Sequence, residues 1–225
     1  MVADHIDTLH QDIHPPARPS GAALVRADTL VVGEIPGRPP GFVDRGELAD
    51  LSGLLTRQDR VVVCAGGRGV GKSVLAAAYA REQITDPAGA GVVVWISGET
   101  ETDVITGLGV LARHANLTVD GEDAEQAAAR ARDYLNGLSV PGLLVIDNAE
   151  TPERLTRWLP TAGACRILLT STDQAFTALA APVHLGDYTR EQSLAYLTER
   201  TGLDDPDGAR QVANELGDLP LALAQ

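Results

Sequence analysis

The sequence predicts an α/β fold in which a parallel sheet is covered by helices on both faces. Short aliphatic runs alternate with longer segments that have the spacing of amphipathic helices, and this alternation requires right-handed crossovers between parallel strands. Five runs are expected to form the strands: residues 61–65, 91–96, 143–147, 166–172 and 182–185. Beyond residue 189 the chain turns wholly helical, which predicts the beginning of a small helical domain.

A glycine-rich turn joins the first of these strands to a helix. Residues 61–65 are mostly β-branched and carry no charge, as in a buried parallel strand. Residues 74–80 are rich in helix formers, and no helix breaker follows before Asp86-Pro87. The connecting turn, residues 66–73, reads G-x-x-x-x-G-K-S and therefore lies between a strand and a helix N-terminus.

This turn has the residues of a phosphate-binding loop. Gly66 and Gly71 allow the backbone N–H groups to approach an anion closely. Lys72 supplies a charge for the β- and γ-phosphates, and the Ser73 hydroxyl is the expected protein ligand of Mg²⁺. The alternative is a turn that binds nothing, and the strand-turn-helix context argues against it. We expect the whole loop and the next residue to bind nucleotide: Gly66, Gly67, Arg68, Gly69, Val70, Gly71, Lys72, Ser73 and Val74.

An acidic residue directly follows another aliphatic strand. Asp147 comes after Leu143-Leu144-Val145-Ile146, which is a Walker B pattern. At the carboxyl edge of a parallel sheet such a carboxylate can reach the hydration shell of Mg²⁺ beside the phosphate-binding loop. Many strands end in aspartate, so the pattern has weight only because it lies downstream of that loop. We expect Ser73 and Asp147 to hold Mg²⁺, and Lys72 and Asp147 to take part in catalysis.

The remaining helices follow from start and stop signals. Asp44 and Glu47 have the spacing of a capping box, before a helix with four leucines on one face: Leu48, Leu51, Leu54 and Leu55. A second capping box, Thr189 with Gln192, opens the helical end of the chain. Further helices are expected over residues 100–115, 122–136, 151–158, 190–200 and 207–216. Gly217 ends the last of these, and the start of another helix follows.

We divide the chain into three parts. Residues 1–40 are expected to be a tail or linker, because they hold six of the thirteen prolines, with one extended piece at residues 29–32. Residues 41–186 are expected to form the nucleotide-binding domain, and residues 187–225 a truncated helical subdomain. The three histidines of the tail do not predict a metal site, because no cysteine or fixed scaffold sets a ligand geometry: His5, His10 and His14.

Charge and composition argue against several partners. The 225 residues include 31 acidic and 18 basic ones, and the formal net charge of −13 opposes binding to a nucleic acid backbone or an anionic membrane. No apolar run is long enough to span a bilayer, and the N-terminus lacks a signal pattern. Cys64 and Cys165 are expected near opposite ends of parallel strands and therefore as free thiols, which suits a cytoplasmic protein.

In their order and spacing, the motifs resemble the nucleotide-binding module of STAND ATPases, the NB-ARC class of apoptosome scaffolds, plant disease-resistance proteins and bacterial regulators. Four motifs carry the resemblance: residues 42–48 (FVDRGEL), 66–73 (GGRGVGKS), 143–147 (LLVID) and 217–223 (GDLPLAL). The resemblance covers about residues 30–225. The alanine-rich composition with few aromatic residues suggests a bacterial source.

The resemblance implies a three-layer P-loop NTPase fold of the ASCE or AAA+-like type. It implies that the five strands lie in the order 5-1-4-3-2 and that an ARC1-like helical subdomain follows them. It also implies ATP or ADP as the ligand, with the backbone of Phe42 and Val43 at the adenine. Arg45 is then expected to help hold the nucleotide and Pro220 to pack on the base. Asp44 departs from the family pattern, which has glycine at this position.

As a function, the resemblance implies a switch that binds ATP or ADP, hydrolyses ATP slowly and couples this to conformational change. Many relatives place a second acid after the Walker B aspartate, where this chain has Asn148, and Glu150 is close enough in sequence to substitute. Thr170 and Thr172 are expected near the nucleotide, although Thr172 stands where the family commonly has a γ-phosphate-sensing arginine. Arg68 or another chain would then have to supply that charge.

The resemblance also bears on partners. Relatives continue into a winged-helix domain and often a repeat sensor, and we expect both in a longer protein that self-associates, while this segment alone is expected to be monomeric. The alternative function is an AAA+ ATPase that acts on DNA or as a loader, and the acidic balance argues against it. A GTPase would need an N-K-x-D-like guanine reader, and residues 170–173 contain no lysine.

Overall fold

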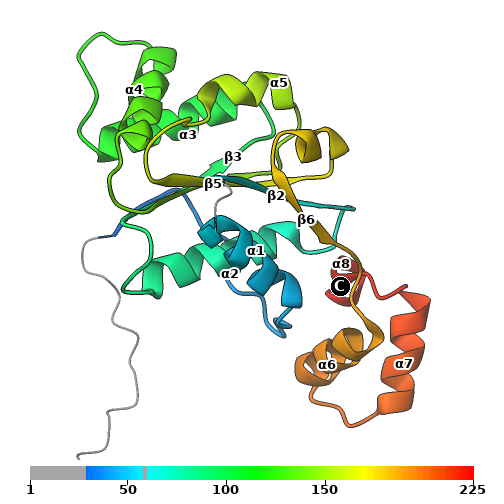
Figure 1. Ribbon diagram of the computed structural model, residues 1–225. Coiled ribbons are helices and arrows are strands. Elements are labelled where there is room, and N and C mark those ends of the chain that lie inside the picture. Colours follow the sequence, from blue (N-terminus) through cyan, green and yellow to red (C-terminus); the bar gives the residue numbers. More distant parts are fainter. Residues whose placement is uncertain (1–28, 58–59) are drawn as a thin grey trace, which may run out of the picture.

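A six-stranded parallel sheet forms the centre of the molecule in the computed structural model, which describes residues 29–57 and 60–225 (Figure 1). The strands are β1 (Leu30–Val32), β2 (Val61–Gly66), β3 (Val92–Ser97), β4 (Gly142–Asp147), β5 (Cys165–Ser171) and β6 (Ala181–Leu185). Their order across the sheet is β1-β3-β4-β5-β2-β6. The ends of β2, β5, β4 and β3 therefore meet at one edge, where ligands bind in open α/β sheets.

The expected number of five strands is wrong, because β1 adds a sixth strand at the edge of the sheet. β1 pairs in parallel with β3, with Leu30 opposite Val92. Three residues are too few to show a periodic pattern, so the sequence indicates only an extended piece inside the expected tail. The other five strands lie in the expected relative order. Residues 1–28, with His5, His10 and His14, lie outside the described residues.

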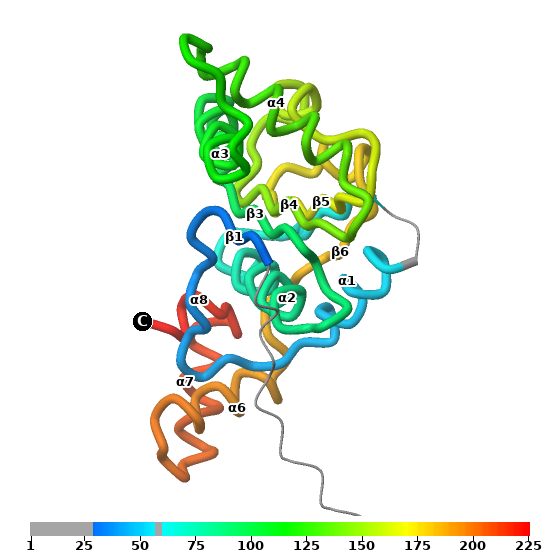
Figure 2. Tube along the Cα trace, turned by 90° about the vertical axis from the view of Figure 1, so that its left-hand side faces the viewer, coloured from blue at the N-terminus to red at the C-terminus, as the bar shows by residue number. Residues whose placement is uncertain are grey.

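Helices cover both faces of the sheet (Figures 1 and 2). One face carries α1 (Gly46–Arg57) and α2 (Lys72–Thr85), and the other carries α3 (Glu101–His114), α4 (Ala124–Asn136), α5 (Pro152–Leu155) and the 3-10 helix η1 (Thr156–Trp158). A second 3-10 helix, η2 (Gln174–Ala178), connects β5 to β6. Strand β2 shows how its side chains alternate between the layers. Val62 and Cys64 join the core cluster of α1 and α2, whereas Val63 joins that of α3 and α4.

Helix caps explain several of the element boundaries. The expected capping box of Thr189 and Gln192 is formed at the start of the helical end. The expected box of Asp44 and Glu47 is not formed, because α1 begins at Gly46 and the Glu47 carboxylate pairs with Arg45 at 2.8 Å. The backbone N–H of Leu48 instead donates to the carbonyl of Arg45. Arg45 itself lines the site described below.

Three helices form the C-terminal part of the chain beside the carboxyl edge of the sheet (Figure 1). They are α6 (Arg190–Thr201), α7 (Pro206–Glu215) and α8 (Pro220–Leu223). The Tyr188 N–H donates to the carbonyl of Asp218 at 3.0 Å, and Arg190 forms a 2.9 Å ion pair with the same aspartate. α8 follows this aspartate and lies against the turn that precedes α2, where the Leu221 N–H donates to the carbonyl of Gly69.

The two cysteines are free and buried, in agreement with the expected reduced thiols. Burial raises the pKa of the Cys64 thiol and of the Cys165 thiol to about 12. Within residues 29–57 and 60–225, no helix has the length and the apolar character needed to cross a membrane.

Candidate nucleotide-binding site

The glycine-rich turn lies between β2 and α2, as expected. Gly71 is the N-cap of α2 and has a φ of +97°, a conformation that other residues rarely adopt. A Cβ atom on Gly66 would lie 2.3 Å from the carbonyl oxygen of Leu185, so only glycine fits beside β6 there. No side chain caps α2, and its first turn contains no acidic residue. The N–H groups and the dipole of this helix end are therefore available to an anion.

Lys72 is held over the turn. Its Nζ donates to the carbonyl oxygens of Gly67 at 2.6 Å and Gly66 at 3.1 Å, and the residue is only 8% exposed. Burial lowers the pKa of Lys72, with a smaller contribution in the same direction from Arg68, while Asp147 acts in the opposite direction. A phosphate group at this position would favour the charged form of the lysine.

Ser73 and Asp147, which are far apart in sequence, meet at the start of α2. The Ser73 hydroxyl donates to Asp147 Oδ1 at 2.7 Å, and the Thr170 hydroxyl donates to the same oxygen at 2.5 Å. The Asn148 N–H in turn donates to Thr170 Oγ1 at 2.9 Å. A hydroxyl and a carboxylate are oxygen ligands of the kind that Mg²⁺ takes beside phosphates. The residues present thus fit the predicted Mg²⁺ site.

A cavity of about 550 Å³ opens next to these groups, a volume typical of small-molecule sites. Most of the predicted site residues line it: Phe42, Val43, Arg45, Arg68, Gly69, Val70, Gly71, Lys72, Ser73, Val74, Asn148, Glu150, Thr172 and Pro220. Four predicted residues do not line the cavity: Gly66, Gly67, Asp147 and Thr170. Of these, Gly66 and Gly67 accept from Lys72, and Asp147 and Thr170 bond to each other.

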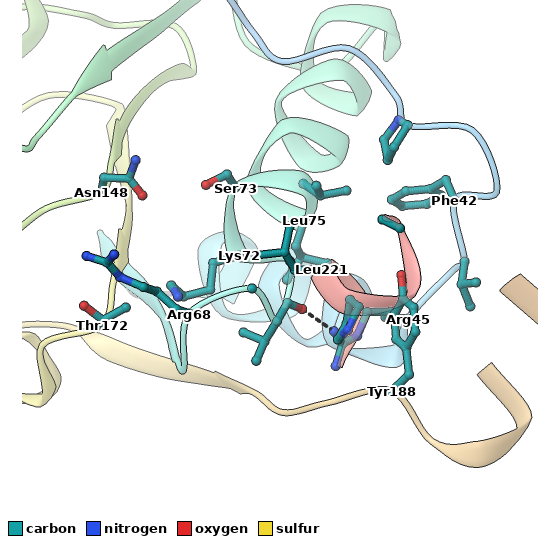
Figure 3. Close-up of a pocket in the computed structure, with 18 of the residues that line it drawn as sticks. Phe42, Arg45, Arg68, Lys72, Ser73, Leu75, Asn148, Thr172, Tyr188 and Leu221 are labelled. Carbon is teal, nitrogen blue, oxygen red and sulfur yellow. Dashed lines mark hydrogen bonds between the residues drawn. The ribbon is translucent and has the colours of Figure 1, made fainter. Parts of the chain in front are cut away.

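Eight further lining residues were not predicted from the sequence: Pro39, Leu75, Glu99, Ala149, Tyr188, Tyr196, Leu221 and Ala224. At one end of the cavity the aromatic side chains of Phe42 and Tyr188 lie near Leu221 (Figure 3). A Cβ on Gly41 would lie 3.1 Å from the Tyr196 ring, so this ring packs against the backbone next to Phe42. Tyr188 directly precedes Thr189, the N-cap residue of α6. Apart from this position next to a capping box, the sequence around Tyr188 contains no pattern that would indicate a place in the cavity.

Arg45 supports the phosphate-binding loop through hydrogen bonds to backbone carbonyls. Its Nη1 donates to the carbonyl of Val70 at 2.8 Å, the dashed line in Figure 3, and its Nη2 donates to the carbonyl of Gly186 at 3.0 Å. The guanidinium also lies over the Tyr188 ring, 5.4 Å from its centroid. The side chain is 7% exposed, and its buried Nε has no partner among the described residues. Arg45 therefore connects the loop to the segment that leads from β6 into α6.

Polar residues from three strand ends face the loop across the cavity. Glu99 follows β3, Asn148 follows β4 and Thr172 follows β5, while Glu150 lies in the loop after β4. In Figure 3 the side chain of Arg68 extends toward the strand ends that carry Asn148 and Thr172. The cavity thus has basic groups on the loop and polar or acidic groups on the strand ends.

No family model matches the sequence, and no curated protein matches it. Solved structures do match. The chain is similar to Cdc6p from Pyrobaculum aerophilum, with a TM-score of 0.60 and 18% identity, over 82% of this chain and 62% of that one. It is similar to the Orc1 protein of Aeropyrum pernix, solved in complex with DNA, with a TM-score of 0.56 and 19% identity, over 82% of this chain and 59% of that one.

A third similar structure is a STAND protein with a tetratricopeptide repeat sensor from Pyrococcus horikoshii. The TM-score is 0.57 and the identity 16%, over 83% of this chain and 30% of that one. The chain therefore spans 62%, 59% and 30% of the length of these three proteins. At such identities the similarity is one of fold. Together with the strand order and the glycine-rich turn, it shows that this chain has the AAA+-like fold of the P-loop ATPases.

Proposed function

We propose that the chain is an ATP- and ADP-binding switch of the STAND type, with slow Mg²⁺-dependent hydrolysis of ATP. The observation that carries this proposal is that two parts of the chain build one cavity. The phosphate-binding loop and α2 form one wall, and Tyr188, Tyr196 and α8 form another. A ligand in this cavity touches both the sheet and the helical part, so their relative position can respond to which nucleotide is bound.

The phosphates are assigned to the loop and to Lys72. The uncapped N–H groups of the first turn of α2 are available to an anion bound at the loop. Lys72 can exchange its hydrogen bonds to the carbonyls of Gly66 and Gly67 for bonds to that anion. Ser73 and Asp147 would hold Mg²⁺, which would supply positive charge to neutralise the phosphates. The base is assigned to the aromatic end of the cavity, between Phe42 and Pro220.

Coupling to the helices runs through short contacts at Gly69. The Leu221 N–H donates to the Gly69 carbonyl at 3.1 Å, and a Cβ on Gly69 would lie 2.8 Å from the Leu221 Cβ. Arg45 adds a second connection, because it bonds both to Val70 in the loop and to Gly186 before α6. A change in the conformation of the loop on binding ATP or ADP is therefore transmitted directly to α8 and to the segment that leads to α6.

Two measurements test this function. Denaturation of the purified protein followed by chromatography identifies any nucleotide carried, and we expect ADP. Calorimetry with ADP and ATP then compares wild type with Lys72→Ala, in which we expect at least about tenfold weaker binding, because a buried charge-assisted contact to phosphate is lost. An unchanged affinity of Lys72→Ala would remove this lysine from the site and refute the assignment.

A second candidate is an AAA+ ATPase that acts on DNA or as a loader. It is favoured by the similarity to Cdc6p and to the Orc1 protein solved with DNA. The formal net charge of −13 opposes it, because a protein that neutralises phosphates needs a basic surface. Fluorescence anisotropy with labelled duplex DNA separates the candidates. A shift that weakens as salt is raised would favour the DNA function over the switch.

The switch proposal extends to a longer protein. The chain spans 30% of the similar STAND protein, which carries a repeat sensor. We propose a winged-helix domain and a repeat region in the full-length protein, with self-association through those parts. Light scattering of this segment with ATP should then show a monomer, and a defined ring would contradict the proposal.

A further inference from the structure

We propose that Glu99 is the carboxylate that orients the attacking water during hydrolysis, and that Asn148 positions it. This inference rests on the proposed ATPase function. The sequence suggested Asn148 or Glu150 for this task, because both follow the Walker B aspartate. The structure instead brings in a carboxylate from the end of the neighbouring strand, β3.

The register of the sheet places Glu99 beside Asn148. Ser97 lies opposite Asp147 in the parallel pair of β3 and β4, so the next residues of both strands leave the sheet together. The Gly98 N–H donates to the Asp147 carbonyl at 2.6 Å, and the Glu150 N–H donates to the Gly98 carbonyl at 3.4 Å. The two loops are thus joined by backbone bonds on either side of Asn148.

Only glycine allows this close approach. A Cβ atom on Gly98 would lie 2.6 Å from the Ile146 side chain and 3.0 Å from Cα of Ala149. Gly98 therefore brings the backbone of Glu99 against the segment that contains Asn148. The Asn148 Nδ2 then donates to Glu99 Oε1 at 3.4 Å.

Asn148 is itself held firmly. Its φ is +58°, a left-handed conformation that asparagine tolerates better than most residues, and its N–H donates to the Thr170 hydroxyl. The chain of bonds continues from Thr170 to Asp147 and from there to Ser73 at the phosphate-binding loop. The position of the Glu99 carboxylate is thus connected to the residues assigned to Mg²⁺ and the phosphates.

Glu99 is better suited to the task than the two residues suggested by the sequence. An asparagine amide can hydrogen-bond a water but cannot accept its proton. The Glu150 side chain has no hydrogen bond or ion pair within the described part of the chain, so nothing there fixes its direction. Glu99 lines the same cavity, has one oxygen held by Asn148 and forms no ion pair with any described residue. Its second oxygen is available to a water.

The proposed reaction is the hydrolysis of ATP to ADP and phosphate. The water oxygen forms a bond to the γ-phosphorus, and the bond from that phosphorus to the β–γ bridging oxygen breaks, with its electron pair remaining on ADP. Glu99 accepts a hydrogen bond from the water, takes one of its protons as the new bond forms, and returns it to solvent after phosphate leaves. Lys72 is placed to stabilise the charge on the phosphates during this step.

The test is single-turnover hydrolysis of radiolabelled ATP by an excess of protein, with ATP and ADP affinities measured in parallel. We expect Glu99→Gln to bind both nucleotides like wild type. We expect it to hydrolyse ATP at least about 100-fold more slowly, which is typical of the loss of a general base. Glu150→Gln should slow hydrolysis far less. Asp120→Asn, an exposed residue with no side-chain bond in the described ranges, controls for the loss of one acidic charge.

Asn148→Gly tests the positioning role separately, because glycine adopts the left-handed backbone readily and removes the side-chain amide. Its hydrolysis should fall by about tenfold with unchanged affinity, and an unchanged rate would overturn the role of Asn148. A wild-type rate in Glu99→Gln, or a larger loss in Glu150→Gln, would overturn the role of Glu99. If the wild-type protein binds neither nucleotide, the proposed function itself is refuted. The affinity measurements therefore distinguish this outcome from a failure of the role of Glu99 alone.

Discussion

The backbone N–H of Leu221 donates to the carbonyl oxygen of Gly69 at 3.1 Å, so the last described helix is bonded directly to the phosphate-binding loop. Gly69 has a φ of +81°, and a Cβ on it would lie 2.8 Å from that of Leu221. The loop and α8 therefore fit together only with glycine at this position. This contact connects the assigned phosphate site directly to the helical part.

Gly69→Ala should weaken this connection. Alanine is strained at this backbone angle and collides with Leu221, so we expect about tenfold weaker ADP binding and faster proteolysis between residues 186 and 220. Gly186→Ala is the matched control, because nothing lies within 4 Å of its added Cβ. Equal affinity and equal proteolysis in Gly69→Ala and wild type would show that the contact does not hold α8.

Nucleotide binding should weaken as the pH is raised. Burial lowers the pKa of Lys72 below its ordinary value, and bound phosphate would favour the charged form and raise the pKa again. At a pH at which Lys72 of the free protein is partly deprotonated, nucleotide binding is therefore accompanied by the uptake of a proton. We expect ADP affinity to fall as the pH rises through the lowered pKa of the free lysine toward the ordinary range of lysine, about pH 10.

Calorimetry in two buffers of different ionisation enthalpy measures this proton uptake. Lys72→Arg provides the control, because arginine stays charged over the whole range. A flat affinity and no proton uptake in the wild type would contradict the assignment of Lys72 to the phosphates.

Both native cysteines should resist alkylation in the folded protein. Cys64 is 0% exposed and Cys165 is 1% exposed, and burial raises the pKa of each thiol to about 12, so the reactive thiolate is scarce at neutral pH. Labelling should appear only on unfolding, and its rate followed by mass spectrometry then reports global opening. Rapid labelling of Cys64 under native conditions would mean that β2 is far less protected than its packing indicates.

The sixth strand can be tested through Gly33. This glycine follows β1 with a φ of +89°, and a Cβ on it would lie 2.0 Å from the Trp95 carbonyl oxygen in β3. Gly33→Ala should lower the free energy of unfolding by about 1–3 kcal/mol, measured by urea denaturation. Gly37→Ala, where nothing lies within 4 Å of the added Cβ, should change it little. The same small effect for both variants would argue that β1 adds nothing to stability.

The sequence predicts those features that depend on local patterns. The glycine-rich turn and the aliphatic run before Asp147 each carry their signal within a few residues, and parallel pairing then brings Ser73 and Asp147 together. β1 escapes prediction because three residues have no period and an edge strand depends on its partner. Glu99 escapes it because its place depends on the close approach at Gly98, which only the folded chain shows.

Arg45 is a further example of a residue whose contacts depend on the folded chain and not on a local sequence pattern. The sequence resemblance implied a contact with the nucleotide, whereas the structure shows bonds to the carbonyls of Val70 and Gly186. These two acceptors lie in segments that are far apart along the chain, so no local pattern could indicate them. The contact of Arg45 with the nucleotide stays a prediction, beside the support that this side chain gives to the loop.

The most direct test of the switch is the distance between the sheet and the helical part in the two nucleotide states. Asp50→Cys on α1 and Glu199→Cys on α6 provide exposed labelling sites, while the native thiols stay buried. Resonance energy transfer between dyes at these positions is then measured at saturating ADP and at saturating non-hydrolysable ATP analogue. We predict two different transfer efficiencies, with the difference lost in Lys72→Ala. The same efficiency with both nucleotides, each shown to be bound, would contradict a nucleotide-controlled switch.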